Sequence, residues 1–183
     1  MRWLTFCILA VVVLTLEVTV APLLEWHGAR PQWLLMLAVF FALNGRSVDV
    51  LIGAWILGLL YDLHTLPEYV GLFSLAFSLV ALVVYGVREF LFREHPLTHF
   101  LVTFVACLVI QIMLDVHRVV AFGDSAGGFW HLSRETLLTA LVTALFALPV
   151  HFVLLRMHRT LGIMPARVGR RRWNLPTRSM SRS

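Results

Sequence analysis

Charged residues are scarce in this chain. They make up 14% of its 183 residues, whereas a soluble domain usually carries about 25%. Hydrophobic residues reach 60%, and the mean hydropathy is +0.85. This balance excludes an ordinary soluble domain and indicates an integral membrane protein. At about 20 apolar residues per span, the length allows one all-α, polytopic bundle of about six transmembrane helices.

Cysteine is scarce as well. Cys7 and Cys107 are the only two, and both fall in apolar stretches, which is typical of small hydrophobic core residues. The sequence has no Gly-rich phosphate loop and no HExxH zinc motif. We therefore expect no disulfide, no metal centre and no cofactor.

Six apolar segments follow one another along the chain. They are Trp3 to Leu24, Pro31 to Leu43, Val48 to Tyr61, Gly71 to Phe92, Leu97 to Val120 and Thr136 to Leu155. The second and third are shorter than a full crossing, so we expect them to extend into their flanks or to meet in a thinned or protein-lined region. If they fused into one broken segment, the count would fall to five. We interpret the first segment as a retained helix rather than a signal peptide, because Glu17 interrupts its apolar core.

The arginines predict the orientation, because cytoplasmic loops are enriched in basic residues. Six spans with both termini inside leave only Arg30, Arg118 and Arg134 on the outer side. A five-span arrangement would put either Arg2 or the basic tail on the wrong side. We therefore expect residues 1–156 to form a six-helix transmembrane domain with both termini in the cytoplasm.

Residues 157–183 form a basic tail that contains no acid and few apolar residues. This composition predicts a disordered segment. Its arginines are densest at Arg170, Arg171 and Arg172, and we expect them to lie against anionic lipid headgroups, with a cytoplasmic protein contact as the alternative. No aromatic-lined groove or folded basic domain accompanies them, so we do not expect a nucleic-acid partner.

Three carboxylates lie within or at the ends of the apolar segments: Glu17, Asp62 and Asp115. An ionisable side chain at membrane depth costs about 2.5 to 3.5 kcal/mol on insertion scales, so each needs a partner, a wet cavity or a functional reason. Gln111 lies at a depth comparable with Glu17, one helical turn before Asp115. Two interpretations compete: a small polar pocket open to the outside, or interhelical hydrogen bonds that hold the bundle, which is the commoner outcome.

Asp62 and Asp115 are each followed two residues later by a histidine, His64 and His117. Carboxylate and imidazole groups together bind divalent metals or relay protons, and all four side chains could face one shallow layer. Residues i and i+2 of a helix do not share a face, however, which argues against a metal site. Because each aspartate lies near the negative end of its own helix dipole, we expect compensation: Arg118 for Asp115, and another helix, a histidine or water for Asp62.

The stretch from Pro31 through Leu79 resembles the rod shape-determining MreD family. Pro31 opens an apolar helix (PQWLLMLAVFFALNGR), GAWILGLLYD follows from Gly53 to Asp62, and VGLFSLAFSLVAL opens the next span. Members of this family typically have a proline-led helix, a Gly-rich helix ending in Gly-Leu-Leu-x-Asp, and a glycine soon afterwards. The matching positions here are Gly58, Leu59, Leu60, Asp62 and Gly71.

The resemblance implies a non-enzymatic scaffold in the bacterial inner membrane that helps to organise lateral peptidoglycan synthesis. The implied partners are the bitopic protein MreC, cytoskeletal MreB, the transglycosylase RodA and a class B penicillin-binding protein. In this role Asp62 is expected to support the extracytoplasmic end of the bundle, while Gly53, Gly58 and Gly71 permit close packing around it.

MreD is also similar in fold to the substrate-binding S components of energy-coupling-factor transporters. The alternative function is therefore the binding of a vitamin-like solute in an outward pocket near Glu17, Asp62, Gln111 and Asp115. Such a pocket needs a volume of about 300 Å³ or more. A small intramembrane enzyme that uses the Asp and His pairs is a third class, and no catalytic spacing supports it.

Overall fold

The structure is a computed structural model that describes residues 3–25, 28–45, 47–65, 71–88, 96–122 and 129–161. Within these ranges the chain forms helices and no strand. The elements are α1 (Trp3–Thr19), η1 (Pro22–Leu24), α2 (Trp33–Asn44), α3 (Ser47–Thr65), α4 (Leu72–Val87), α5 (Pro96–Phe122) and α6 (Phe129–Leu161). The predicted all-α membrane bundle is confirmed.

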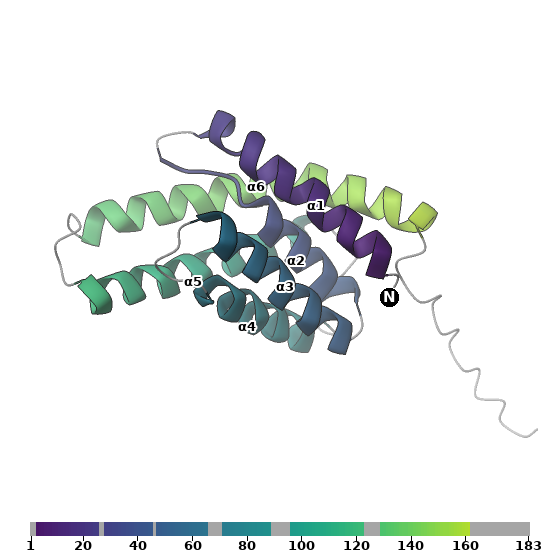
Figure 1. The fold of residues 1–183 in the computed structure, drawn as a ribbon. Coiled ribbons are helices and arrows are strands. Elements are labelled where there is room, and N and C mark those ends of the chain that lie inside the picture. The colour runs from purple at the N-terminus through teal and green to yellow at the C-terminus, as the bar shows by residue number, and fades with distance from the viewer. Residues whose placement is uncertain are drawn as a thin grey trace, which may run out of the picture.

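Consecutive helices run in opposite directions, so the odd-numbered helices point one way and the even-numbered helices the other (Figure 1). The start of α1 and the end of α6 therefore lie at the same end of the bundle (Figure 1). We call the other end, where α1, α3 and α5 finish, the carboxylate end, because it holds Glu17, Asp62 and Asp115.

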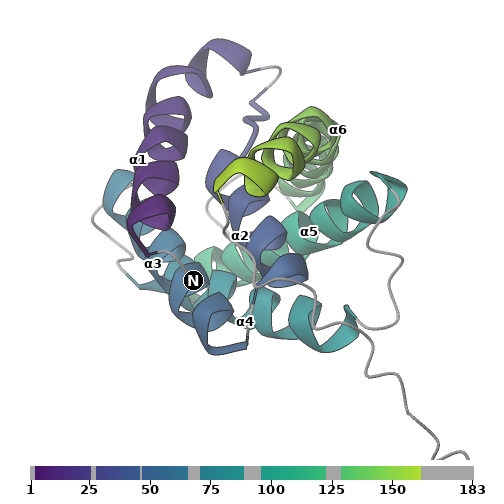
Figure 2. The ribbon, with the colours of Figure 1, turned by 90° about the vertical axis from the view of Figure 1, so that its right-hand side faces the viewer.

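Helix α2 lies in the middle of the bundle, with the other helices around it (Figure 2). Every residue from Leu34 to Leu43 is buried, and none is more than 4% exposed. A helix of 12 residues is only about 18 Å long, too short to cross a hydrocarbon core of about 30 Å. Because other helices enclose it, α2 fits the protein-lined interpretation of the second apolar segment.

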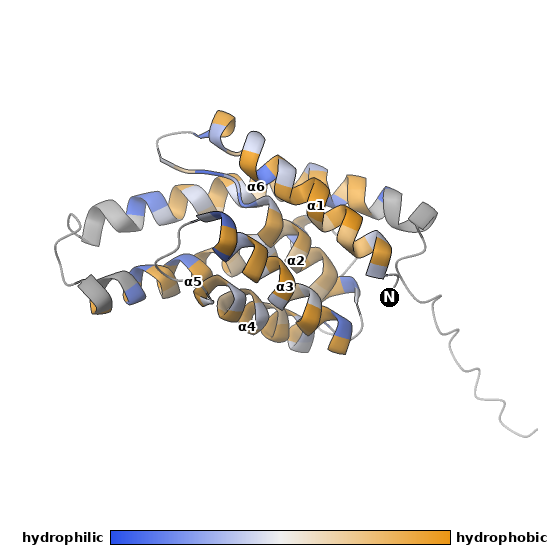
Figure 3. Cartoon of the chain, in the orientation of Figure 1, coloured by the Kyte–Doolittle hydropathy of each residue, from blue (hydrophilic) through white to orange (hydrophobic). Residues whose placement is uncertain are grey.

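Three apolar stretches are long enough to cross a membrane: Val48–Thr65, Leu97–His117 and Arg134–Leu154. The helices α1, α2 and α4 are apolar but shorter. Hydrophobic residues predominate in the middle of the helices, and hydrophilic ones lie mainly toward the helix ends (Figure 3). This distribution is that of a multi-pass membrane protein.

The helix bounds differ from the predicted segments at several ends. The third segment is not short, because α3 continues past Tyr61 to Thr65, where the Thr65 hydroxyl donates to the Tyr61 carbonyl oxygen at 2.7 Å. Hydropathy alone misses such a polar last turn. Helix α6 continues past Arg156 to Leu161, and the rest of the predicted disordered tail, residues 162–183, lies outside the described residues.

Candidate functional site

Asp62 lies in the last turn of α3 and holds the first turn of α4. Its Oδ1 accepts the backbone N–H of Phe73 at 3.1 Å, and its Oδ2 accepts the N–H of Ser74 at 3.0 Å. The first N–H groups of a helix have no partner within the helix, and they carry the positive end of its dipole. The carboxylate therefore satisfies two donors and places its charge where the dipole of α4 favours it, although Asp62 is only 3% exposed.

Two glycines make this contact possible. Gly58 lies one turn before Asp62 on the same face of α3, and a Cβ there would come within 2.4 Å of the Ser74 Cα. Only a residue without a side chain lets α4 approach this closely. Gly71, the residue before α4, has a φ of +108°, a backbone conformation that glycine adopts without strain. The Gly-Leu-Leu-x-Asp pattern thus corresponds to one close helix junction.

Glu17 makes an equivalent contact one helix pair earlier. Its Oε2 accepts the backbone N–H of Leu34 at 3.0 Å, and the backbone N–H of Trp33 also interacts with this carboxylate. Both donors belong to the first turn of α2. Glu17 is 4% exposed, so a carboxylate from α1 caps the buried central helix from inside the protein.

The chain that leads into α2 has further buried partners. Pro31 and Gln32 are both buried, and the Gln32 N–H donates to the Thr143 hydroxyl of α6 at 3.3 Å. The Cys107 thiol of α5 lies 3.7 Å from Gln32 Oε1. Cys107 and Cys7 are both free thiols. The beginning of α2 is therefore held by polar groups from α1, α5 and α6.

Asp115 contacts the last helix pair. Its Oδ2 accepts the Thr136 hydroxyl hydrogen at 2.8 Å, which links α5 to α6. A carboxylate therefore links each of the pairs α1–α2, α3–α4 and α5–α6, but only Glu17 and Asp62 accept backbone N–H groups of a helix first turn, whereas Asp115 accepts a side-chain hydroxyl. In each pair, a carboxylate near the end of the odd-numbered helix accepts a hydrogen bond from the early part of the next helix.

The other residues singled out by the sequence do not take part in these three carboxylate contacts. Gly53 packs against α1, because a Cβ there would lie 3.4 Å from the Phe6 ring. Gln111 is half-buried on α5. Asp62 is buried but His64 is exposed, so this pair does not face one common layer. Arg170, Arg171 and Arg172 lie outside the described residues.

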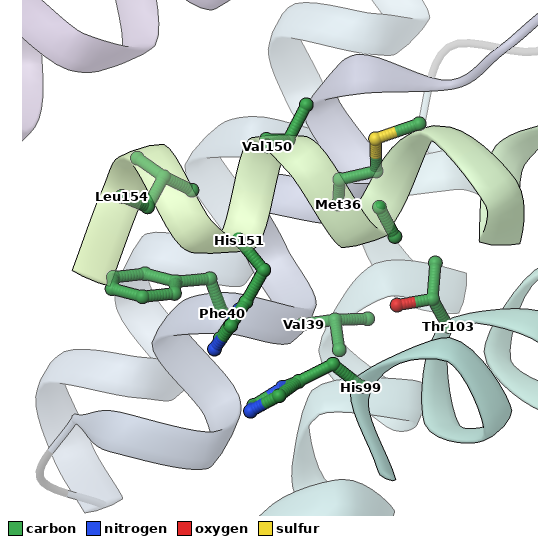
Figure 4. Close-up of a pocket in the computed structure, with 9 residues that line it drawn as sticks. Met36, Val39, Phe40, His99, Thr103, Val150, His151 and Leu154 are labelled. Carbon is green, nitrogen blue, oxygen red and sulfur yellow. The ribbon is translucent and has the colours of Figure 1, made fainter. Parts of the chain in front are cut away.

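The sequence reasoning missed a pair of buried histidines near the opposite end of the bundle. His99 and His151 belong to no motif, and they are only 3% and 8% exposed. Their rings stack with centroids 3.2 Å apart, and the Phe40 ring lies edge-on to His151 at 5.1 Å. They come from α5 and α6 (Figure 4). No sequence signal identifies the pair, because 52 residues separate its members.

A small cavity lies beside the two histidines. Its volume is about 10 Å³, and it is lined by Met36, Val39, Phe40, His99, Thr103, Ala147, Val150, His151 and Leu154 (Figure 4). That volume accommodates about one water molecule, whereas ligand sites measure about 300 to 1,000 Å³. In the described part of the chain, no group of three His, Cys, Asp or Glu side chains is placed to hold a metal ion.

Comparison with known proteins identifies a family. The model of the family described as rod shape-determining protein MreD matches residues 1–158, which include nearly all of the helical bundle. No curated protein and no solved structure matches the chain. The similarity of its fold to S components therefore stays a prediction.

Proposed function

Because this chain belongs to the MreD family of rod shape-determining membrane proteins, we propose that it acts as a non-enzymatic scaffold for lateral peptidoglycan synthesis. In this role it binds a bitopic MreC-like protein and, with it, MreB, RodA and a class B penicillin-binding protein. The chain provides a fixed arrangement of membrane helices on which these partners assemble.

The hydrogen bonds of Glu17, Asp62 and Asp115 are the observation that carries this proposal. Glu17 and Asp62 direct their oxygens at backbone N–H groups of the next helix, and Asp115 accepts a hydroxyl from α6. Carboxylates that capture a solute or transfer protons would instead face a cavity of ligand size. The contacts described here stabilise helix junctions, which favours a scaffold over the S-component alternative.

We further propose that the bundle lies in the bacterial inner membrane with both termini in the cytoplasm. The distribution of arginines supports this orientation, and the common position of the two helical ends agrees with it (Figure 1). The tail arginines, including Arg170, Arg171 and Arg172, would then contact anionic headgroups of the inner leaflet. The carboxylate end would face outward.

The test is affinity isolation of the tagged protein from its native membrane in mild detergent, followed by mass spectrometry. We expect the MreC-like protein and the wall-synthesis enzymes to be recovered with it. Recovery of paired ATPases and a coupling subunit would instead establish a solute-capture protein. Recovery of neither group would contradict the scaffold.

Two variants separate a specific role of the helix junction from general damage. Asp62→Ala removes the acceptors for two N–H groups of α4, and we expect it to lower partner recovery. Leu63→Ala changes the adjacent residue, which is 69% exposed, and should leave recovery unchanged. If both variants recover partners as the wild type does, Asp62 has no part in assembly.

A further inference from the structure

The stacked histidines His99 and His151 join α5 to α6 near the end of the bundle opposite the carboxylate end. Their ring centroids are 3.2 Å apart, and the ring planes differ by 26°. Figure 4 shows the two side chains reaching from α5 and α6 into the space beside Phe40 of α2. Histidine is the side chain whose charge ordinarily changes near neutral pH. Two such groups are therefore in direct contact inside the protein.

The other side chains around this pair do not compensate a positive charge. Apart from the two histidines and the hydroxyl of Thr103, the residues of α2, α5 and α6 that line the adjoining cavity are apolar. No acid, lysine or arginine is among these lining residues. Among the described residues, His151 Nε2 has no hydrogen-bond partner. A proton on either ring would therefore place a charge without a counter-ion in an apolar site, which is costly.

The short distance between the rings adds a second cost. Two imidazolium ions stacked at 3.2 Å would repel each other, so the pair cannot take up two protons without separating. Once α5 and α6 part and water reaches the rings, each becomes an ordinary histidine with a pKa of about 6.5. The opened form of this contact therefore binds protons that the stacked form excludes.

Proton binding to one form alone shifts the equilibrium toward that form. Above about pH 6.5 the rings are neutral in both forms, so the stacked contact keeps its full stability. As the pH falls below that value, the opened form gains up to two protons and the contact weakens progressively. The Asp115–Thr136 hydrogen bond joins α5 to α6 elsewhere, about 22 Å along α6 from His151 at 1.5 Å per residue. We therefore expect a local opening.

We propose that His99 and His151 form a proton-sensitive contact between α5 and α6. The rings are stacked and neutral at neutral pH, and they separate when acidification protonates them. The contact gives the bundle a response to acid at the end opposite the buried carboxylates. It is separate from the scaffold role, because it is a property of the chain alone and needs no partner.

Hydrogen-exchange mass spectrometry of the purified full chain in detergent, at pH 7.5 and pH 5.5, tests the proposal. Protection factors correct for the intrinsic pH dependence of exchange. In peptides that contain His99 or His151, we expect them to fall by up to about 100-fold, or about ten-fold for each ring. Peptides from the start of α4 should keep their protection. Unchanged protection at both histidines overturns the proposal, and so does an equal fall in α4, which would indicate general unfolding.

Replacing the rings identifies the groups that respond. The double variant His99→Phe, His151→Phe keeps two aromatic rings but removes both titrating groups, so its protection should be the same at the two pH values. His64→Phe is the matched control, because His64 is an exposed histidine of α3, and it should retain the wild-type fall.

The single variants His99→Phe and His151→Phe keep the test decisive if the double variant does not fold. Each retains one titrating ring, so its protection should fall by about ten-fold rather than 100-fold. A fall as large as that of the wild type, in the double variant or in both single variants, would assign the acid response to other groups and overturn the proposal.

Discussion

The buried carboxylates of Glu17 and Asp62 accept hydrogen bonds from backbone N–H groups at the start of the next helix. The first N–H groups of a helix need acceptors, and inside a bilayer each unsatisfied group costs several kcal/mol. Asp62 supplies two acceptors to α4, and Glu17 supplies one to Leu34 of α2. The helix dipoles favour negative charge at these points, which compensates for placing an acid near the end of its own helix.

Asp62→Ala should destabilise the protein by about 1 to 3 kcal/mol, because two buried N–H groups lose their acceptors. Asp62→Asn keeps one side-chain oxygen and should cost roughly half as much. Thermal unfolding of the purified protein in detergent measures both. Leu63→Ala is the control, and equal melting temperatures for Leu63→Ala and Asp62→Ala would contradict this role.

Gly58→Ala should destabilise the bundle as well, because the new Cβ would meet the backbone of Ser74 and Phe73. Overpacking of this kind costs about 1 to 3 kcal/mol. Gly86→Ala is a matched control in α4, since a Cβ at Gly86 meets open space. Thermal unfolding in detergent compares the two variants. If Gly58→Ala melts at or above the temperature of Gly86→Ala, α3 and α4 do not pack closely at Gly58.

The central helix α2 depends on its neighbours more than the other helices do. It has 12 residues, and isolated helices shorter than about 12 to 15 residues are marginal in water. Its side chains are buried by the surrounding helices, and its first turn is bonded to Glu17 of α1. Packing and this cap therefore stabilise α2.

Glu17→Ala should loosen the start of α2. We expect the amide of Leu34 to exchange its hydrogen faster in this variant, because the N–H loses its acceptor. Glu17→Gln retains an oxygen and should protect the amide partly. Hydrogen-exchange mass spectrometry in detergent follows peptides that contain Leu34, and unchanged exchange in Glu17→Ala would show that the contact does not stabilise α2.

The sequence predicted the helices better than their junctions. Apolar runs located all six helices, because hydropathy reports membrane spans directly. Hydropathy placed the end of the third segment at Tyr61 and the end of the last at Leu155, whereas α3 continues to Thr65 and α6 to Leu161. A polar last turn, such as the one that contains Thr65, continues a helix without raising its hydropathy. The carboxylates were noticed because charge is costly in apolar helices, but their acceptor roles depend on which helix packs beside them. The His99–His151 stack was missed for the same reason.

The whole molecule has its two helical ends on one side (Figure 1), so one measurement tests the predicted orientation of both. A reporter that fluoresces only in the cytoplasm should be active when fused before Met1 or after Ser183. The same reporter inserted between α5 and α6 should be inactive, because that connection is at the carboxylate end. Activity from the α5–α6 insertion, with inactive terminal fusions, would invert the proposed orientation.

Three carboxylate-linked helix pairs suggest how the bundle would perform the proposed scaffold role. The junctions fix α2, α4 and α6 from the carboxylate end, while exposed apolar faces such as that of α3 remain open to partners or lipid. In the proposed scaffold role, loss of one junction should affect cell shape through the assembly of the partners. This links the geometry of Asp62 to the family's role in cell shape.

The most direct test of this account is cell width in the native bacterium after replacement of the chromosomal copy by Asp62→Ala. Leu63→Ala serves as the control, and membrane levels of both proteins are measured by immunoblot. We predict rods of normal width with Leu63→Ala, and wider, rounded cells with Asp62→Ala at an equal protein level. Normal width with Asp62→Ala at that level would contradict the claim that this junction supports rod shape.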